Sequence, residues 1–369
     1  MSTRQFRIGS VIVGGDAPVT IQSMCNTPTQ DVAATLQQIN MLAAAGCEII
    51  RLAVPDMAAA EAFSAITGAS PLPVIADIHF DHRLALAAMQ HGAAAIRVNP
   101  GNLGGSEAVK AVAEALQKYD LPVRVGANSG SLPKEFQAHL TAATATEHDE
   151  LLSEALVQSA LSQVAEFEYY GVRNIKVSLK ASSVPATVKA YRKFADRSDC
   201  PLHIGVTEAG TPAVGVIKSA VGIGALLLDN IGSTIRVSLT ADPLQEVIAA
   251  RRILESAGVR SPEPDLVSCP TCGRTRINLV ELAEKVEELI NRIKAENCRI
   301  NLKKIAVMGC VVNGPGEAKD ADIGIAGGDG KVVIFRRGIV EATLPESEGF
   351  AALEKLIRAN TSPKVKSTV

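Results

Sequence analysis

Four of the chain's seven cysteines gather in its last hundred or so residues, and this group is the first sign of chemistry. Cys269 and Cys272 form a C-x-x-C pair, and Cys310 follows in the stretch MGCVVNGPGE. A C-x-x-C pair alone serves zinc sites, redox dithiols and iron–sulfur clusters. An odd number of cysteines spread over 369 residues does not suit a disulfide framework. The group therefore predicts a metal or redox site.

The loop after Cys310 narrows this choice. Its two glycines and one proline, in residues 313–317, let the backbone approach a bulky ligand closely, as loops around iron–sulfur clusters require. Cys298 lies at the end of a predicted helix, outside any glycine-rich turn, and we interpret it as a structural thiol. A zinc site with Cys298 as its fourth ligand remains an alternative on spacing alone.

A second set of polar residues interrupts short apolar runs in the first two thirds of the chain. Many of them recur two positions apart, which places them on one face of a strand. The set comprises Arg51, Asp77, His79, Arg97, Asn99, Arg124, Asn128, Lys176, Ser178, Lys180, His203, Thr207, Glu208, Arg236 and Ser238. Six members are cations and only two are carboxylates, although the whole chain has a net charge of −2.

This imbalance predicts an anionic ligand, because an unpaired charge inside a protein costs several kcal/mol. A small diphosphate would balance the cations most simply. Salt bridges at the rim are the alternative for any single residue, and Lys176 or Lys180 could instead form a Schiff base, as in aldolase barrels. Glu208, just before a glycine at the end of the seventh run, is the candidate acid or base.

Eight apolar runs alternate with Ala/Leu-rich helical segments such as 31–46 and 241–258. The runs cover residues 19–24, 48–54, 73–79, 94–100, 122–129, 174–182, 201–210 and 233–239. Strands that alternate with helices predict a parallel sheet, and eight repeats match an α/β fold of the (β/α)8, TIM-like barrel type. A doubly wound open sheet is disfavoured because no G-x-G-x-x-G follows the first strand.

The pattern changes after Gly258, where a proline-rich segment begins. We predict a substrate-binding barrel over residues 1–256, a linker over 257–266, and a smaller α+β iron–sulfur domain over 267–369. In this second domain we expect helices over 279–296 and 344–359 and strands over 304–312 and 332–335.

Composition excludes several classes of protein. The near-neutral charge, 3% aromatic residues and absence of Trp argue against nucleic acid as a partner. No apolar run approaches the ~20 residues needed to span a bilayer, and the first ten residues lack an apolar signal segment. We expect a soluble protein of the cytoplasm without a membrane partner.

The chain contains the motifs IQSMCNT, PVIADIHFDHR, IRVNPGN, VRVGANSGSL, KVSLKAS, GVTEAG, IRVSLTADP, CPTCGR and MGCVVNGPGE. Together these motifs closely resemble those of the bacterial 4-hydroxy-3-methylbut-2-enyl diphosphate synthases. The resemblance runs from about residue 6 to residue 360. It implies a barrel followed by a domain with one 4Fe–4S cluster, whose ligands would be Cys269, Cys272, Cys310 and Glu317. Cys25 departs from the pattern, where a threonine usually stands, and we assign it no role.

The resemblance also implies the reaction. Members of the family that the chain resembles reduce 2-C-methyl-D-erythritol 2,4-cyclodiphosphate with ring opening and loss of water, and they take electrons from flavodoxin or ferredoxin. Glu208 would then handle protons, and the barrel residues would bind the diphosphate: Arg51, His79, Arg97, Asn99, Arg124, Asn128, Lys176, Lys180 and Arg236. Two alternatives come from other classes. One is a phosphate-binding, aldolase-like barrel with a structural zinc domain, and the other is a cluster-bearing regulatory or binding protein without turnover.

A homodimer is the expected assembly. The last barrel helix runs away from the catalytic face, so the linker starts near the opposite face. Its ten residues reach at most about 33–36 Å when fully extended, little more than the height of a barrel with its loops, roughly 30 Å. A site shared between two chains removes the need for a stretched linker.

Overall fold

The computed structural model describes residues 3–132, 140, 144–261, 264–296, 298–310 and 318–363. The chain divides into two compact units, Met1–Arg260 and Ser261–Val369. This division falls inside the range 257–266 that we predicted as the linker. Each unit has its own buried apolar core.

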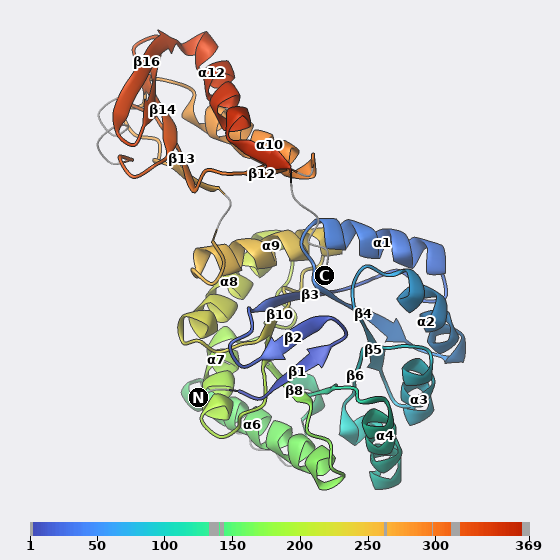
Figure 1. Ribbon diagram of the computed structural model, residues 1–369. Coiled ribbons are helices and arrows are strands. Elements are labelled where there is room, and N and C mark those ends of the chain that lie inside the picture. The colour runs from blue at the N-terminus through green and yellow to red at the C-terminus, as the bar shows by residue number, and fades with distance from the viewer. Residues whose placement is uncertain are drawn as a thin grey trace. The chain divides into compact units, whose positions relative to one another are not determined.

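The first unit is the predicted parallel barrel (Figure 1). Neighbouring strands pair in the order β8-β7-β6-β5-β4-β3-β10-β9, and a parallel bridge from Val177 to Leu202 brings β8 back to β9. All eight runs predicted as strands contain one. The strands are β3 (Thr20–Met24), β4 (Ile49–Val54), β5 (Val74–Ile78), β6 (Ala95–Arg97), β7 (Val123–Asn128), β8 (Ile175–Lys180), β9 (His203–Ile204) and β10 (Thr234–Ile235).

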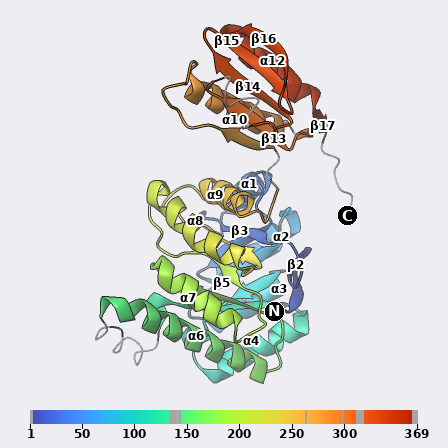
Figure 2. The same cartoon turned by 90° about the vertical axis from the view of Figure 1, so that its left-hand side faces the viewer.

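A helix follows each barrel strand and covers its outer face; Figure 2 shows α6 to α9 on one side of the barrel. Aspartates begin several of these helices: the side chains of Asp31, Asp56, Asp81 and Asp242 accept hydrogen bonds from backbone N–H groups of the first turn. The helices are α1 (Val32–Ala44), α2 (Met57–Ala69), α3 (His82–Gln90), α4 (Ser106–Tyr119), α6 (Ala145–Tyr169), α7 (Val184–Ala195), α8 (Pro212–Leu228) and α9 (Pro243–Ser256), and the short 3-10 helices η1 (Pro100–Asn102) and η2 (Ser129–Ser131) lie in loops.

An antiparallel hairpin that the sequence did not predict lies at one end of the barrel (Figure 1). It consists of β1 (Gln5–Ile8) and β2 (Val11–Gly14). The hairpin's Phe6 and Val13 form one apolar cluster with Ile49 and Ile75, which stand at or near the starts of β4 and β5. The hairpin therefore covers the amino-terminal ends of strands, and the carboxyl-terminal ends stay available for a site.

The second unit is α+β, as predicted. Its five-stranded sheet has the order β11-β13-β14-β15-β16, in which the first three strands are parallel and the last two antiparallel. Both long helices pack their apolar faces against this sheet. The elements are β11 (Asp265–Ser268), α10 (Leu279–Ala295), β12 (Cys298–Ile300), β13 (Lys304–Met308), β14 (Ile323–Gly328), β15 (Lys331–Arg336), β16 (Ile339–Pro345), α12 (Glu346–Ala359) and β17 (Thr361–Pro363).

Replacing Phe6 by Ala should destabilise the barrel. The Phe6 side chain is 6% exposed and fills the cluster beneath the strands, and such truncations cost about 3–5 kcal/mol. Thermal denaturation would show this as a lower melting temperature. Ile12→Ala, in the same hairpin but 40% exposed, is the control and should change the melting temperature little. Equal melting temperatures of the two variants would contradict a structural role for the hairpin.

Candidate functional site

Four charged residues stand side by side across consecutive barrel strands. Asp77 of β5 is the register partner of Arg97 on β6, which pairs with Arg124 on β7, which pairs with Lys176 on β8. Register partners in a parallel sheet point to the same face, and the outer face here is covered by apolar helices. One carboxylate and three cations therefore share a row inside the barrel.

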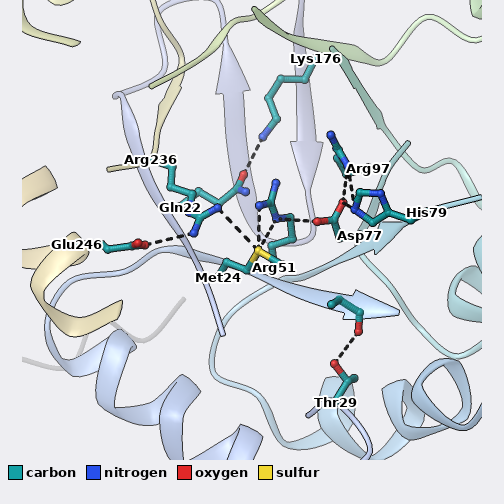
Figure 3. Close-up of polar contacts among 11 residues, drawn as sticks. Gln22, Met24, Thr29, Arg51, Asp77, His79, Arg97, Lys176, Arg236 and Glu246 are labelled. Carbon is teal, nitrogen blue, oxygen red and sulfur yellow. Dashed lines mark hydrogen bonds and ion pairs between the residues drawn. The ribbon is translucent and has the colours of Figure 1, made fainter. Parts of the chain in front are cut away.

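Asp77, at one end of this row, lies among Arg51, Arg97 and His79 (Figure 3). Its Oδ1 lies 3.1 Å from Arg97 Nη1 and 3.7 Å from His79 Nε2, and its Oδ2 lies 3.4 Å from Arg51 Nε. Burial tends to raise the pKa of Asp77, but the Arg51 guanidinium, His79 and Arg97 outweigh it and hold that pKa well below its usual range. Asp77 is thus a permanent carboxylate that fixes two arginines.

Three barrel cations have no carboxylate partner in the part of the chain that the structure describes. Arg124, Lys176 and Lys180 are almost fully buried, yet no Asp or Glu oxygen of the described residues lies within 4.0 Å of their charged groups. The Nε and Nη1 atoms of Arg124 have no hydrogen-bond partner among these residues. Within the described ranges, Lys176 Nζ donates to a single acceptor, Gln22 Oε1, at 3.3 Å. An anion that entered the barrel would satisfy such donors.

Burial lowers the pKa of three basic side chains inside the barrel. It lowers the pKa of Lys176 and Lys180 well below the usual value, and neighbouring Arg124 lowers both further. Gly205 makes room beside Lys180, since a Cβ there would lie 3.0 Å from Lys180 Nζ and 2.4 Å from the Arg236 carbonyl oxygen. His203 is buried, and burial lowers its pKa too; its Nδ1 lies 2.8 Å from Thr234 Oγ1.

Several site residues escaped the sequence interpretation. Glu246, in the first turn of α9, is 5% exposed and accepts hydrogen bonds from Leu239 N–H at 2.9 Å and Arg236 Nη2 at 3.4 Å. The sulfur of Met24 accepts from Arg51, and Gln22 accepts from Lys176. A glutamate in a first helical turn and a methionine in an apolar strand are common, so no signal in the sequence marked them.

The remaining predicted barrel residues lie near the strand ends. Asn99 follows β6 and its carbonyl begins η1, while Asn128 ends β7 opposite Lys180 in register. Glu208 lies four residues after β9, exposed, with no side-chain partner among the described residues. Its φ of +52° is strained for a residue with a side chain, a feature that recurs at functional sites.

The thiols of the second unit lie after two adjacent parallel strands. Ser268 of β11 pairs with Val307 of β13, so Cys269 and Cys310 follow strands that end at the same edge of the sheet. The N–H of Gly309 donates to Cys269 Sγ at 3.2 Å. Backbone and side-chain hydrogen bonds from Arg274 lower the pKa of Cys272. Soft thiolates with N–H donors to sulfur are the donor chemistry of iron–sulfur sites.

Within the described ranges, no three side chains of metal-binding type lie close enough to share one ion. Glu317, the fourth predicted ligand, lies outside the described residues. Cys298, by contrast, lies in β12, paired with β17.

The isolated cysteines of the barrel are structural. Cys25, Cys47 and Cys200 are buried in or against the layer between strands and helices. Burial raises the pKa of Cys25 and of Cys47 to about 12, and also raises that of Cys200. The thiol of Cys25 is therefore a weak nucleophile.

Comparison with known proteins gives a consistent result over both units. The family model described as the GcpE TIM-barrel domain matches residues 3–251, and that of the GcpE protein C-terminal domain matches residues 265–359. A protein of Geobacter sulfurreducens named 4-hydroxy-3-methylbut-2-en-1-yl diphosphate synthase (flavodoxin) is 54% identical over 95% of this chain and 96% of its own. A protein of the same name from Clostridium perfringens is 48% identical over 96% of this chain and 98% of its own.

Among solved structures, the likeness concerns the fold. The 7,8-dihydropteroate synthase of Vibrio fischeri superimposes with a TM-score of 0.50 at 14% identity and covers 69% of this chain and 98% of its own. Separately, none of the helices in the described part of the chain is both long and apolar enough to cross a membrane.

Binding of pyrophosphate should take up protons. Burial and neighbouring arginines lower the pKa of Lys176 and Lys180, whereas a bound anion favours the charged ammonium form and raises that pKa. Protons are therefore drawn from solvent on binding, and the affinity falls as the pH rises. Isothermal titration calorimetry in two buffers with different ionisation enthalpies measures the proton count.

The matched variants are Lys180→Met and Lys110→Met, the latter on the exposed face of α4. Lys180→Met should reduce the proton uptake and weaken binding, and Lys110→Met should change neither. A binding heat that is the same in both buffers would contradict the coupling.

Proposed function

The chain belongs to the GcpE family, as its motifs predicted, and from this membership we propose which of its residues perform the reaction. It is an oxidoreductase, a 4-hydroxy-3-methylbut-2-enyl diphosphate synthase of the methylerythritol phosphate route to isoprenoids. The reaction consumes 2-C-methyl-D-erythritol 2,4-cyclodiphosphate, two electrons and two protons, and yields 4-hydroxy-3-methylbut-2-enyl diphosphate and water. Membership in this family favours this function over the aldolase-like barrel with a zinc domain.

The excess of buried cations is the observation that supports a diphosphate substrate. Arg51, Arg97 and Arg236 each have a carboxylate partner, whereas Arg124, Lys176 and Lys180 have none within the described part of the chain. The three unpaired cations supply charge, and the arginines held by Asp77 supply oriented N–H donors. Together they bind the two phosphate groups, with His79, Asn99 and Asn128 near the strand ends.

Glu208 is proposed to hold the proton for the departing oxygen. It follows β9 near the carboxyl-terminal end of the barrel, is exposed, and forms no ion pair with a described residue. A carboxyl group that is free of a partner can deliver a proton to the hydroxyl oxygen that leaves as water. Its backbone, fixed at φ +52°, limits the directions in which the side chain can point.

The second unit is proposed to hold one 4Fe–4S cluster through Cys269, Cys272, Cys310 and Glu317. When bound, the cluster supplies electrons one at a time and an iron that acts as a Lewis acid. The Gly309 N–H that donates to Cys269 Sγ stabilises the thiolate. Flavodoxin, named in the relatives' description, is the proposed electron donor, with ferredoxin as the alternative. Free cysteines fit a reducing compartment, the cytoplasm.

A homodimer with shared sites is proposed as the working assembly. On α8, the apolar side chains of Val214, Ile217, Val221 and Leu228 are each more than half exposed. A groove of about 810 Å³ lies beside them, lined by residues of α8 and α9. An apolar ridge beside an apolar groove can pair with its own copy about a twofold axis.

The direct test of the function is anaerobic turnover. The purified protein, supplied with a reductant and the cyclodiphosphate, should form 4-hydroxy-3-methylbut-2-enyl diphosphate. Iron and sulfide analysis of the same sample should give close to four of each per chain, as one 4Fe–4S cluster requires. A protein that carries zinc in place of iron and sulfide, and that shows no turnover, would overturn the proposal.

Replacement of the proposed ligands should remove iron in a graded way. Cys269→Ala, Cys272→Ala and Cys310→Ala each remove a strong thiolate ligand and should lose most of the iron and its visible absorption. Glu317→Ala removes a weaker ligand and should retain more. Cys298→Ala, whose thiol lies in β12, is the control and should keep the iron content. Full iron and full activity in Cys310→Ala would refute the ligand set.

Mixing two inactive chains tests the shared site. Glu208→Gln impairs the barrel half of a site and Cys310→Ala impairs the cluster half. If each site joins the barrel of one chain to the second unit of its partner, every mixed dimer has one site with two intact halves, and activity returns. If sites form within one chain, every site carries one defect. Absent activity in mixed dimers whose formation has been verified would reject sharing.

A further inference from the structure

Met24 lies where two barrel arginines approach each other (Figure 3). It ends β3, which pairs with β4 on one side and β10 on the other. Its sulfur accepts hydrogen bonds from Arg51 Nη2 at 2.9 Å and Arg51 Nε at 3.3 Å, and lies 3.8 Å from the donor Nη1 of Arg236. Met24 and Arg51 are also register partners across the two strands.

Each of these arginines also reaches a carboxylate. Arg51 Nε lies 3.4 Å from Asp77 Oδ2, and Arg236 Nη2 lies 3.4 Å from Glu246 Oε2. The sulfur is therefore the one acceptor, among the described side chains, that both guanidinium groups share. A guanidinium has five N–H donors, so these contacts leave others for a ligand.

A filling role in the apolar core does not explain this residue. Ile21 of β3 and Cys25, the residue after the strand, belong to the barrel's apolar core, whereas Met24 is half-buried and is not part of that cluster. Its described contacts are with guanidinium groups. A thioether is a weak acceptor without charge, so it can orient N–H groups and leave their positive charge intact.

We propose that Met24 is a positioning residue for the substrate: its sulfur holds Arg51 and Arg236 at a fixed separation without adding a further negative charge beside either one. Both guanidinium groups then present their remaining N–H donors together to one diphosphate. A carboxylate at this position would bind the same N–H groups more strongly but would cancel charge that the substrate needs. This role rests on the proposed function, because it assigns the two arginines to diphosphate binding.

Three substitutions at this position separate the contributions. Met24→Leu keeps the size and removes the acceptor, Met24→Gln keeps an unbranched chain with an uncharged acceptor, and Met24→Glu adds a charged one. Met41→Leu, on α1 and 39% exposed, is the control for loss of a thioether elsewhere. The readouts, on the cluster-containing protein, are the Kd for inorganic pyrophosphate, KM and kcat for the cyclodiphosphate, and visible absorption.

Met24→Leu should raise both Kd and KM about three- to tenfold, the effect of losing hydrogen bonds to one weak, uncharged acceptor. Its kcat and its visible absorption should stay as in the unmodified protein. Met24→Gln should restore most of the affinity, and Met24→Glu should bind pyrophosphate more weakly than Met24→Leu. Met41→Leu should match the unmodified protein throughout.

Contrary results would have distinct meanings. An unchanged Kd in Met24→Leu, or no recovery in Met24→Gln, would overturn the positioning role. Pyrophosphate binding by Met24→Glu as tight as by the unmodified protein would overturn the argument that charge must be preserved. An unmodified protein that neither binds pyrophosphate nor converts the cyclodiphosphate would overturn the proposed function, and the role of Met24 with it.

Discussion

The cost of burying like charges side by side governs this barrel. Asp77 meets part of that cost, since it is a carboxylate held between Arg51 and Arg97 in the same row as Arg124 and Lys176. Glu246 meets another part by reaching Arg236 from outside the sheet, through the first turn of α9. What remains of the cost is reduced because burial lowers the pKa of Lys176 and Lys180, which favours their neutral form. In the proposed function, a bound anion would offset what remains of this cost.

The fold supports this arrangement at both ends of the strands. At the amino-terminal end, Phe6 and Val13 of the hairpin pack with Ile49 and Ile75 and provide an apolar floor. At the other end, the loops carry residues in strained or capping conformations, such as Glu208 and Asn99. Side chains of alternating direction connect the two, with apolar residues facing the helices and polar residues facing inward. The barrel strands therefore fix the positions from which the long charged side chains extend, and so restrict where their charged groups can lie.

The eight strands and the inward cations could be predicted because a parallel strand has a period of two that survives in the sequence. The proximity of Cys269 and Cys310 could be predicted because each thiol stands in a short local motif next to a strand. Their role as cluster ligands stays a prediction. Met24, Gln22 and Glu246 could not, since each acts through a contact set by strand register or by helix packing, and none of these residue types is unusual where it stands. The hairpin β1–β2 escaped for a similar reason: its strands are short, and its partners Ile49 and Ile75 lie far away in sequence.

The hairpin that covers the amino-terminal ends of the strands also determines by which end of the barrel small molecules can enter and leave. Because that end is packed with apolar side chains, whatever reaches the row of cations enters and leaves by the carboxyl-terminal face. In the proposed reaction, substrate and product both carry a diphosphate, so both would bind the same cations and use the same route. Product would then have to leave before the next substrate binds, and the residence time of the product would set an upper bound on the turnover rate.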